Sequence, residues 1–537
     1  MPTTGKRVHD VVVIGSGCAG GAAAWQLSRR GLGVLVLEAG DRVAAPDSHP
    51  VQTLSSTVSR LWRVLIARSQ RVQSFHPSYW TYPSQLFVDD REHPYSTPDG
   101  RPFVWIRGRQ VGGRSLTWAG LALRLSPYEL KEWPIGYEDL APHYDEMERL
   151  MAIHGGADHL PQLPDGQYLD PKALTPAESL FKERIAARWP DRHVVNARGV
   201  DRATKNGWSL KSSPGSTLGA AEDTGLVDVR PNSVVRRLVT DPGSGRVSGV
   251  EIVHRRTKAV TLIPARAVIV CASSLESVRL LLNSRSAAHP AGLGNSRGLL
   301  GRFIMNKVSR STMFQMSVDG ASTIHPLTAS DSFVIPRYVN LDRPTDGVEG
   351  GFGVWGAIQR MPVDPKVALQ PGKSALGLLI GYGECQPYHD NMVELDTGRA
   401  DQWGVPTIRV DVHWRDSERR MAARIQEDLR AMVDAAGGTV TEPVTHDPIT
   451  RNLIGRVLSA GALPGTYVHE VGGARMGTSA TDSVVNDHCQ VWDSDNVFVT
   501  DGACWPTGPW QNPTLTMMAV TARSCAFVAD RFAAGDL

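Results

Sequence analysis

The hydrophobic positions near the start of the chain form two short apolar runs separated by a glycine-rich turn and an alanine-rich stretch. The first run is Val11 to Ile14 and the second is Val34 to Leu37. The residues between them, GSGCAGGAAAWQLSRR, begin with small turn formers and continue with helix formers. A strand, a tight turn, a helix and a second strand in this order are typical of a βαβ unit with parallel strands.

The glycines of this unit match the dinucleotide-binding pattern G-x-G-x-x-G. Gly15 permits the tight turn, and Gly17 lets the backbone approach a pyrophosphate, with Cys18 inside the same loop. Gly20 lets the helix pack closely on the sheet. Glu38 closes the second run, where it can accept hydrogen bonds from a ribose diol and repel a 2′-phosphate. The unit therefore predicts binding of a dinucleotide, with FAD and NAD both open.

Strand-like runs return after Val227, in LVDVRPNSVVRRLVTD and VSGVEIVHRR. They predict a small β-meander that leads back to a core strand, Ala267 to Cys271. The apolar helical pattern that follows has Ser273 and Ser274 at its start, and either serine could cap it.

Residues 301–461 combine strand-like runs, DSFVIPRYVN, SALGLLIGYGE and TIRVDVHW, with one amphipathic helical pattern, SERRMAARIQEDLRAMVDAAG. This combination predicts a sheet with helices behind it. By contrast, residues 41–100 have no period and predict an irregular excursion.

Near the end of the chain, Asn512 and Pro513 open an apolar helical pattern, with Asn512 expected at the N-cap and Pro513 at the first helical position. The positive end of that helix would stabilise the negative charge of a reduced flavin. His469 lies in TYVHEVGGARMGT, and spacing alone does not bring it to Asn512. A core histidine and a simple helix cap remain open as the alternative interpretation.

Composition narrows the class of protein. A chain of 537 residues is too long for one ordinary hydrophobic core, so we expect two domains, or one large domain with an elaborated second. Its contents of 41% hydrophobic and 21% charged residues are typical of a globular protein. A net charge of +2 without a basic run argues against nucleic-acid binding. No apolar run reaches the ~18 residues of a membrane span. MPTTGKRVHD leads directly into the first strand, so we expect no signal peptide and a cytoplasmic location.

The six cysteines are scattered, without a C-x-x-C pair or the spacing of metal ligands, and predict buried thiols and no metal site. A second glycine pair, Gly112 and Gly113, lies in FVWIRGRQVGGRSLTWAG and is flanked by Arg107, Arg109 and Arg114. This segment predicts either another close approach of the backbone to phosphate or flavin, or an ordinary turn.

Several motifs together resemble the glucose-methanol-choline (GMC) oxidoreductases. They are the fingerprint with Glu38, VGGRSLTWAG, WPIGYEDLAPHY, VIVCASSLESVRLLLNS, GNSRGLLGRFIM, GECQPYHDNMVELD, HEVGGARMGT and VTDGACWPTGPWQNPTLTMMAVTARSC. They occur in the order of that family from residue 11 to residue 530, and the closing segment is most similar to the branch of pyranose 2-oxidase and bacterial glycoside 3-oxidases.

The resemblance implies an α/β fold, α+β overall, with a Rossmann-like FAD-binding domain. A discontinuous substrate domain would be built on a mixed β-sheet with helices behind it. We assign residues 1–55, 100–125, 220–300 and 462–537 to the FAD-binding domain. The substrate domain and its covering excursions would take residues 56–99, 126–219 and 301–461.

The resemblance also implies the chemistry. His469 would be the base that accepts a hydroxyl proton while hydride passes to flavin N5, with Asn512 as its partner on the same oxygen. A histidine suits this role because its usual pKa, about 6.5, leaves it largely neutral at working pH. Besides the fingerprint residues and Arg107, the expected FAD contacts are Gly112, Gly113, Ser115, Val235, Ala272, Asp501, Gly502, Pro513 and Thr514.

Two positions depart from the family pattern. Thr117 stands where pyranose 2-oxidase has the histidine that bonds covalently to FAD, so the resemblance predicts dissociable FAD. Asn306 and Lys307 follow GRFIM, where the family often has a histidine.

The predicted function is FAD-dependent oxidation of a hydroxyl group of a sugar or glycoside. Aromatic faces suit a pyranose ring, and the tryptophans of the candidate segments are Trp105, Trp118, Trp355, Trp505 and Trp510. An alternative is the 6′-hydroxyl of an aminoglycoside precursor, for which Glu384, Asp390 and Glu394 are candidate cation partners. A flavin-binding isomerase or lyase and a non-enzymatic dinucleotide-binding protein are further alternatives. The oxidised carbon, the electron acceptor (O2 or another) and the oligomeric state stay open.

Overall fold

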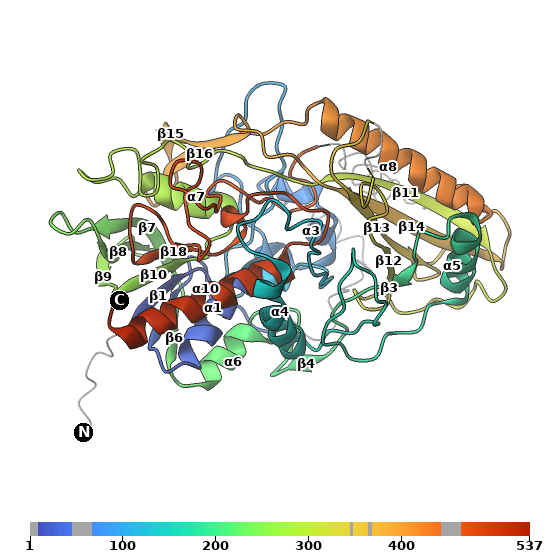
Figure 1. Ribbon diagram of the computed structural model, residues 1–537, viewed down its shortest axis with the longest axis horizontal. Coiled ribbons are helices and arrows are strands. Elements are labelled where there is room, and N and C mark those ends of the chain that lie inside the picture. The colour runs from blue at the N-terminus through green and yellow to red at the C-terminus, as the bar shows by residue number, and fades with distance from the viewer. Residues whose placement is uncertain (1–8, 46–66, 344–346, 364–367, 442–462) are drawn as a thin grey trace.

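The computed structural model describes residues 9–45, 67–343, 347–363, 368–441 and 463–537, and shows two lobes, each built on its own sheet (Figure 1). The strands that carry the dinucleotide fingerprint lie in one lobe, and the long helix α8 covers the other (Figure 1). The predicted domain ranges 1–55, 56–99 and 301–461 each include residues outside the described set.

The first lobe contains a five-stranded parallel sheet in the order β18-β10-β1-β2-β6. Its strands are β1 (Val11–Ile14), β2 (Val34–Leu37), β6 (Val227–Arg230), β10 (Ala267–Val270) and β18 (Val497–Val499). Every residue of β1 and β2 is buried, as expected for parallel strands covered on both faces. The helices α1 (Cys18–Ser28) and α10 (Thr514–Ala534) pack together on this sheet.

The predicted meander is confirmed as a three-stranded antiparallel sheet. It consists of β7 (Ser233–Thr240), β8 (Val247–His254) and β9 (Val260–Pro264), and leads into β10 and α7 (Ser274–Asn283). The predicted serine cap of α7 is wrong: Ser273 occupies the N-cap with a φ of +81°, and its side chain makes no capping hydrogen bond.

The second lobe contains a six-stranded sheet in which all adjacent strands are antiparallel. In order, its strands are β17 (Gly438–Val440), β11 (Val308–Ser317), β14 (Ser374–Gly383), β13 (Phe352–Ile358), β12 (Phe333–Ile335) and β3 (Val195–Asn196). The mixed sheet that we expected for the substrate domain is therefore not found here: this sheet is antiparallel, and the parallel strands lie in the first lobe. The TIRVDVHW run forms β16 (Pro406–Asp411), which pairs with β15 (Met392–Ala400) in a separate ribbon.

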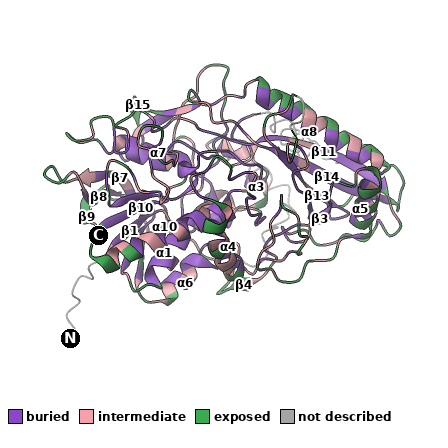
Figure 2. Ribbon diagram, in the orientation of Figure 1, coloured by how far each residue is buried: buried purple, intermediate pink, exposed green. Residues whose placement is uncertain are grey.

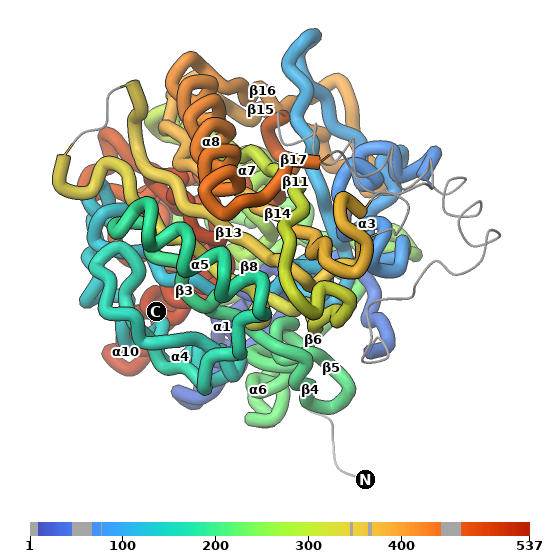
Figure 3. Tube along the Cα trace, turned by 90° about the vertical axis from the view of Figure 1, so that its right-hand side faces the viewer, coloured from blue at the N-terminus to red at the C-terminus, as the bar shows by residue number. Residues whose placement is uncertain are grey.

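Two helices cover the outer face of the six-stranded sheet, α5 (Pro176–Arg188) and α8 (Asp416–Ala435) (Figure 3). The predicted long helix is confirmed as α8, which buries Met421, Ile425 and Leu429 toward the sheet. Its other side is exposed to solvent (Figure 2). Burial of one apolar stripe fixes the position of this helix.

The remaining described elements are short or peripheral. Residues 67–100 contain three short helical segments joined by irregular chain, whereas residues 46–66 of the same excursion lie outside the described residues. The helix α4 (Tyr137–Met151) packs on α10, where the hydroxyls of Tyr144 and Thr516 are 2.8 Å apart. The others are α3 (Pro77–Thr81), α6 (Thr217–Asp223), β4 (Thr204–Lys205), β5 (Trp208–Ser209), η1 (Gln73–Phe75), η2 (Ser84–Leu86), η3 (Gly113–Leu116) and η4 (Gly502–Cys504).

Candidate active site

A cavity of about 360 Å³ lies at the carboxyl ends of the parallel strands. Its lining includes Gly15 after β1, Glu38 after β2, Cys271 after β10 and Asp501 after β18. This edge is where open α/β sheets bind their ligands. The far end of the cavity reaches His469 and Asn512.

The glycines of the fingerprint shape the loop between β1 and α1. Gly15 has a φ of +98°, and a Cβ there would lie 2.3 Å from the carbonyl oxygen of Cys271. A Cβ on Gly20 would lie 1.9 Å from the carbonyl oxygen of Gly15, so only glycine allows this close packing of helix on loop. Gly17 lines the cavity, and nothing lies within 4 Å of where its Cβ would be. No side chain caps α1, so its first N–H groups suit a pyrophosphate.

The carboxylate of Glu38 is buried at the next strand end. It accepts hydrogen bonds from the Ser16 amide at 3.2 Å, the Ser16 hydroxyl at 2.6 Å and the Gly40 amide at 2.9 Å. Burial raises the pKa of Glu38, and these hydrogen bonds oppose that effect. The Ser16 hydroxyl also accepts a hydrogen bond from the Gly112 amide at 3.0 Å, so it joins the two glycine segments.

The second glycine pair lies against the first loop. Gly112 has a φ of +97°, and a Cβ on Gly113 would be 3.4 Å from the Cα of Gly17. Ser115 donates to the carbonyl oxygen of Gly112 at 2.5 Å. Thr117 lines the cavity and donates to the carbonyl oxygen of Arg114 at 3.3 Å.

Charged side chains meet along the middle of the cavity. Arg109 pairs with Glu276 at 3.1 Å and keeps a buried Nη1 without a partner. Burial would raise the pKa of Glu276, but the guanidiniums of Arg279, Arg109 and Arg107 lower it to about 2. Arg107 itself donates to the carbonyl oxygen of His93 at 2.7 Å. Among the described residues this Nη1 has no hydrogen-bond acceptor, so a ligand rich in oxygen acceptors would suit this part of the cavity.

Most of the predicted FAD contacts lie on this cavity. The lining residues among them are Gly15, Gly17, Cys18, Glu38, Arg107, Gly113, Ser115, Val235, Ala272, Asp501, Pro513 and Thr514. The cavity lining does not include Gly20, Gly112 or Gly502. Gly20 and Gly112 instead allow the close packing that shapes the two loops. Direct contact of Gly502 with the cofactor stays a prediction.

The structure brings His469 and Asn512 together at the far end. The Nδ2 atom of Asn512 is 3.2 Å from Nε2 of His469. Burial, together with the nearby cations Lys307 and Arg114, holds the pKa of His469 well below its usual range. The imidazole is therefore neutral and able to accept a proton.

The expected N-cap role of Asn512 is wrong. Pro513 occupies the N-cap of α10, and the Asn512 side chain makes no capping hydrogen bond. Its Oδ1 atom is buried without a partner, while Nδ2 contacts His469. The side chain of Asn512 is thus directed to the imidazole rather than to its own helix.

Side chains that sequence reasoning missed form the walls around this pair. Tyr382 and Tyr467 pack edge to face, with ring centroids 5.5 Å apart, and the Tyr382 ring lies 6.2 Å from that of His469. His76 is at the N-cap of α3, where its Nδ1 accepts from the Ser78 amide at 3.2 Å. Burial, with Arg114 nearby, lowers the pKa of His76 to about 3. His76 lies in the aperiodic excursion, so no sequence pattern pointed to it.

Comparison with known families agrees with this geometry. Residues 10–290 match the family described as FAD dependent oxidoreductase, and residues 387–521 match GMC oxidoreductase. The chain belongs to the FAD-dependent oxidoreductases of the GMC family. Its cofactor is therefore FAD, and the cavity offers a glycine loop, a helix N-terminus and a buried acid that fit the adenosine and pyrophosphate part.

Similar proteins cover nearly the whole oxidoreductase. It is 29% identical to 2-methyl-1,2-propanediol dehydrogenase of Mycolicibacterium austroafricanum, over 99% of this chain and 97% of that protein. It is 28% identical to paromamine 6′-oxidase of Streptomyces fradiae, over 99% and 92%. It is 24% identical to C-glycoside 3-oxidase of Arthrobacter globiformis, over 97% and 95%.

A solved structure shares the fold. The crystal structure of a pyridoxine 4-oxidase from Mesorbium loti superimposes on the oxidoreductase with a TM-score of 0.62 and 19% sequence identity, and covers 97% of this chain and 99% of the other. At this identity the likeness concerns the fold.

The two positions that depart from the family pattern lie beside the base of the oxidoreductase. Lys307 is buried and donates to the carbonyl oxygens of Trp510 and Gln511. Asn306 accepts from the Gly465 amide at 3.0 Å. Both line a void of about 10 Å³ together with His469 and Gln511.

Several expected substrate contacts of the oxidoreductase lie elsewhere. Trp105 and Trp118 line the large cavity, whereas Trp505 lines only the small void, and Trp355 and Trp510 line neither. The carboxylates proposed as cation partners also do not line the cavity. Glu384 pairs with Arg337, Asp390 with Arg415 and Glu394 with Arg302. Each of these carboxylates therefore already forms an ion pair with an arginine that is distant in the sequence.

Within the described residues, no group of three or more His, Cys, Asp or Glu side chains is arranged to hold a metal ion. Among the helices of the same part of the chain, none has both the length and the apolarity needed to cross a bilayer.

Proposed function

We propose that this oxidoreductase oxidises a hydroxyl group of a sugar or glycoside, with His469 as the base. The observation that carries the proposal is the neutral imidazole of His469, 3.2 Å from the Asn512 amide at the end of a cavity that fits FAD. A base and a second polar group that meet the same oxygen are what alcohol oxidation requires.

His469 accepts the hydroxyl proton, because burial and nearby cations keep its ring neutral. The substrate oxygen would take the place of the present Asn512 contact at Nε2. Asn512 hydrogen-bonds the same oxygen and holds it in line with the base, and alignment of this kind contributes several kcal/mol to catalysis. Bound FAD supplies the hydride acceptor. The aromatic walls exclude water from the reacting groups.

The walls support a carbohydrate as substrate. Trp105, Trp118, Tyr382 and Tyr467 all line the cavity, and aromatic faces suit the apolar face of a pyranose. The similarity to a C-glycoside 3-oxidase points the same way. We propose either a primary or a secondary hydroxyl as the reacting group.

We also propose that FAD is held without a covalent bond. Thr117 lines the cavity, and in the sequence it stands where the family pattern has the histidine that bonds to FAD. Its side chain has no nucleophilic nitrogen. Acid precipitation of the yellow protein should leave FAD in the supernatant. Flavin that stays in the pellet would contradict this proposal.

The 6′-hydroxyl of an aminoglycoside precursor is a second candidate, supported by the similarity to paromamine 6′-oxidase. A cationic substrate favours a nearby carboxylate. Glu470 follows the base and lines the cavity, but it is already paired with Arg114 at 3.3 Å. The carbohydrate proposal therefore comes first.

The decisive experiment is anaerobic bleaching of the FAD absorbance near 450 nm with sugars, glycosides, aminoglycosides and 1,2-diols. Bleaching by sugars or glycosides is the expected result. Bleaching by aminoglycosides alone would favour the second candidate, and bleaching by none would contradict alcohol oxidation and favour an isomerase or lyase. Recovery of colour in air would identify O2 as an acceptor.

A further inference from the structure

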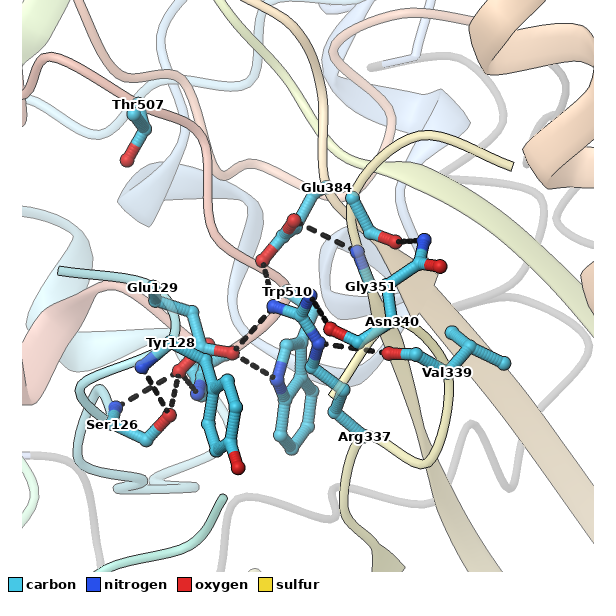
Figure 4. Close-up of polar contacts among 12 residues, drawn as sticks. Ser126, Tyr128, Glu129, Arg337, Val339, Asn340, Gly351, Glu384, Thr507 and Trp510 are labelled. Carbon is cyan, nitrogen blue, oxygen red and sulfur yellow. Dashed lines mark hydrogen bonds and ion pairs between the residues drawn. The ribbon is translucent and has the colours of Figure 1, made fainter. Parts of the chain in front are cut away.

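A buried cluster of charged side chains lies next to the catalytic pair and has no part in the reaction as described. It consists of Glu129, Arg337 and Glu384, which come from three distant parts of the chain (Figure 4). The side chain of Glu129 is fully buried, and that of Arg337 is 7% exposed. Burial of these charges carries a desolvation cost, which points to a role for the cluster beyond stability.

Five donors converge on the two oxygens of Glu129. Oε1 accepts from Arg337 at 3.3 Å and from the indole N–H of Trp510 at 3.1 Å. Oε2 accepts from the Gln511 side chain at 2.8 Å, and from the amide and the hydroxyl of Ser126 at 2.9 and 2.5 Å. Only a group that accepts everywhere and donates nowhere satisfies this set, which is the property of a carboxylate.

Two of these donors belong to the residues just before Asn512. Trp510 and Gln511 are both buried, and their side chains point to Glu129. Their carbonyl oxygens accept from Lys307 on another side. The backbone that leads into Asn512 is thus held by its side chains and by its carbonyls.

The rest of the structure makes room for this arrangement. A Cβ on Gly353 would lie 2.4 Å from the ring of Trp510, and a Cβ on Gly351 would lie 2.4 Å from Nε of Arg337. Glu384 accepts from the Gly351 amide at 2.8 Å and from Arg337 at 3.2 Å. The cluster is therefore packed into a fitted site with little freedom to shift.

We propose that Glu129 is a positioning residue for the reaction. Through Trp510 and Gln511 it fixes the backbone that carries Asn512, and so sets the Asn512 and His469 pair on the substrate oxygen. Glu129 itself does not line the cavity. The proposal rests on the proposed function, because it assigns Glu129 to the same proton abstraction.

The test uses the holoenzyme and Glu129→Gln, which keeps the size of the side chain but places an NH2 group among donors. At least one of the five donors loses its acceptor, and the 510–512 segment shifts. The rate constant of anaerobic flavin reduction at saturating substrate should fall about tenfold or more, since small misplacements cost up to about 100-fold. The substrate dissociation constant should change less than about threefold. A smaller fall in rate overturns the proposal.

Glu178→Gln is the matched control. Glu178 is also fully buried, and accepts from Arg360 at 2.7 and 2.6 Å and from two backbone amides. It lies in α5, on the outer face of the six-stranded sheet. Both variants should lose stability in thermal melts, but only Glu129→Gln should lose rate. An equal loss of rate in both variants overturns the proposal.

If Glu129→Gln does not fold, Gln511→Met cuts one arm and keeps the backbone carbonyls for Lys307. It should lower the reduction rate constant threefold or more, and a smaller effect overturns the proposal. If both single variants fold, the double variant should reduce FAD hardly more slowly than Glu129→Gln alone, as expected for residues that act through one contact.

A second readout needs no alcohol. Sulfite adds reversibly to enzyme-bound flavin, and its dissociation constant should shift threefold or more in Glu129→Gln but not in Glu178→Gln. If no alcohol bleaches the wild-type enzyme, the proposed function fails, and an unchanged sulfite constant would overturn the positioning role separately.

Discussion

The two loops that close the ends of the cavity are held in opposite ways. The loop from Gly15 to Gly20 is fixed by backbone packing, with carbonyl oxygens where a Cβ would be. The segment from Trp510 to Asn512 is fixed by side chains, through Glu129 and Lys307. The first has open space at Gly17, which suits a phosphate, whereas the second holds one amide beside one imidazole. In our proposals, backbone packing shapes the phosphate site and buried charge positions the reacting side chains.

The largest effect should come from removing the base. His469→Ala should lower the rate constant of flavin reduction by about 10³-fold or more, within the range for general base catalysis. FAD should stay bound, because the adenosine and pyrophosphate end of the cavity is unchanged. Stopped-flow reduction and the ratio of FAD to protein measure the two parts. Wild-type rates in this variant would show that another group is the base.

Asn512→Ala should cost less, about 10²-fold in the same rate constant, because it removes one hydrogen-bond donor and leaves the base. As its side chain does not cap α10, the melting temperature should hardly change. A large loss of stability with an unchanged rate would return Asn512 to the role of a helix cap.

The glycine loop offers a matched pair of variants. In Gly20→Ala the new methyl would lie 1.9 Å from a carbonyl oxygen, so we expect about 1–3 kcal/mol of lost stability and weak FAD retention. In Gly17→Ala the methyl has open space, so the apoprotein should melt like the wild type while FAD binds more weakly. Thermal melts with and without FAD separate the two. Equal melting of both apoproteins would contradict the packing argument.

The smallest effect concerns pH. Burial, Lys307 and Arg114 hold the pKa of His469 well below its usual range, so the free imidazole is already neutral near pH 7. A base of this kind loses activity only when the pH falls through its lowered pKa. The reduction rate constant should therefore vary less than about twofold between about pH 6 and 9. If the rate constant instead fell tenfold for each pH unit below about 6.5, the base would have the pKa of an ordinary histidine.

Features held by local backbone packing could be predicted from the sequence, whereas contacts between distant side chains could not. The glycine loop, α8 and the meander each have a local signal, either small residues at fixed spacing or an apolar period, and all three are found as predicted. Asn512 was wrongly expected at the N-cap because Asn-Pro is a local capping pattern, and a contact with His469, 43 residues away, outweighed it.

The missed residues have no local signal. Glu129 meets Trp510 across 381 residues, and Arg337 meets Glu129 across 208. Nothing about Glu129 in SPYELKEW distinguishes it from a surface acid. The sequence predicts Glu384 near a cationic substrate because it does not reveal the ion pair with Arg337, which only the three-dimensional structure brings together. Buried ion pairs depend on three-dimensional proximity, which residue spacing does not report.

The walls of the cavity include two side chains that do not contact the Glu129 cluster, His76 at the N-cap of α3 and Trp118 after η3. Their replacement would reshape the cavity wall and leave the contacts of Glu129 in place. We therefore expect substrate range to change more than the rate of the reaction. A library limited to these two positions should yield altered substrate preferences at a nearly constant rate constant of flavin reduction.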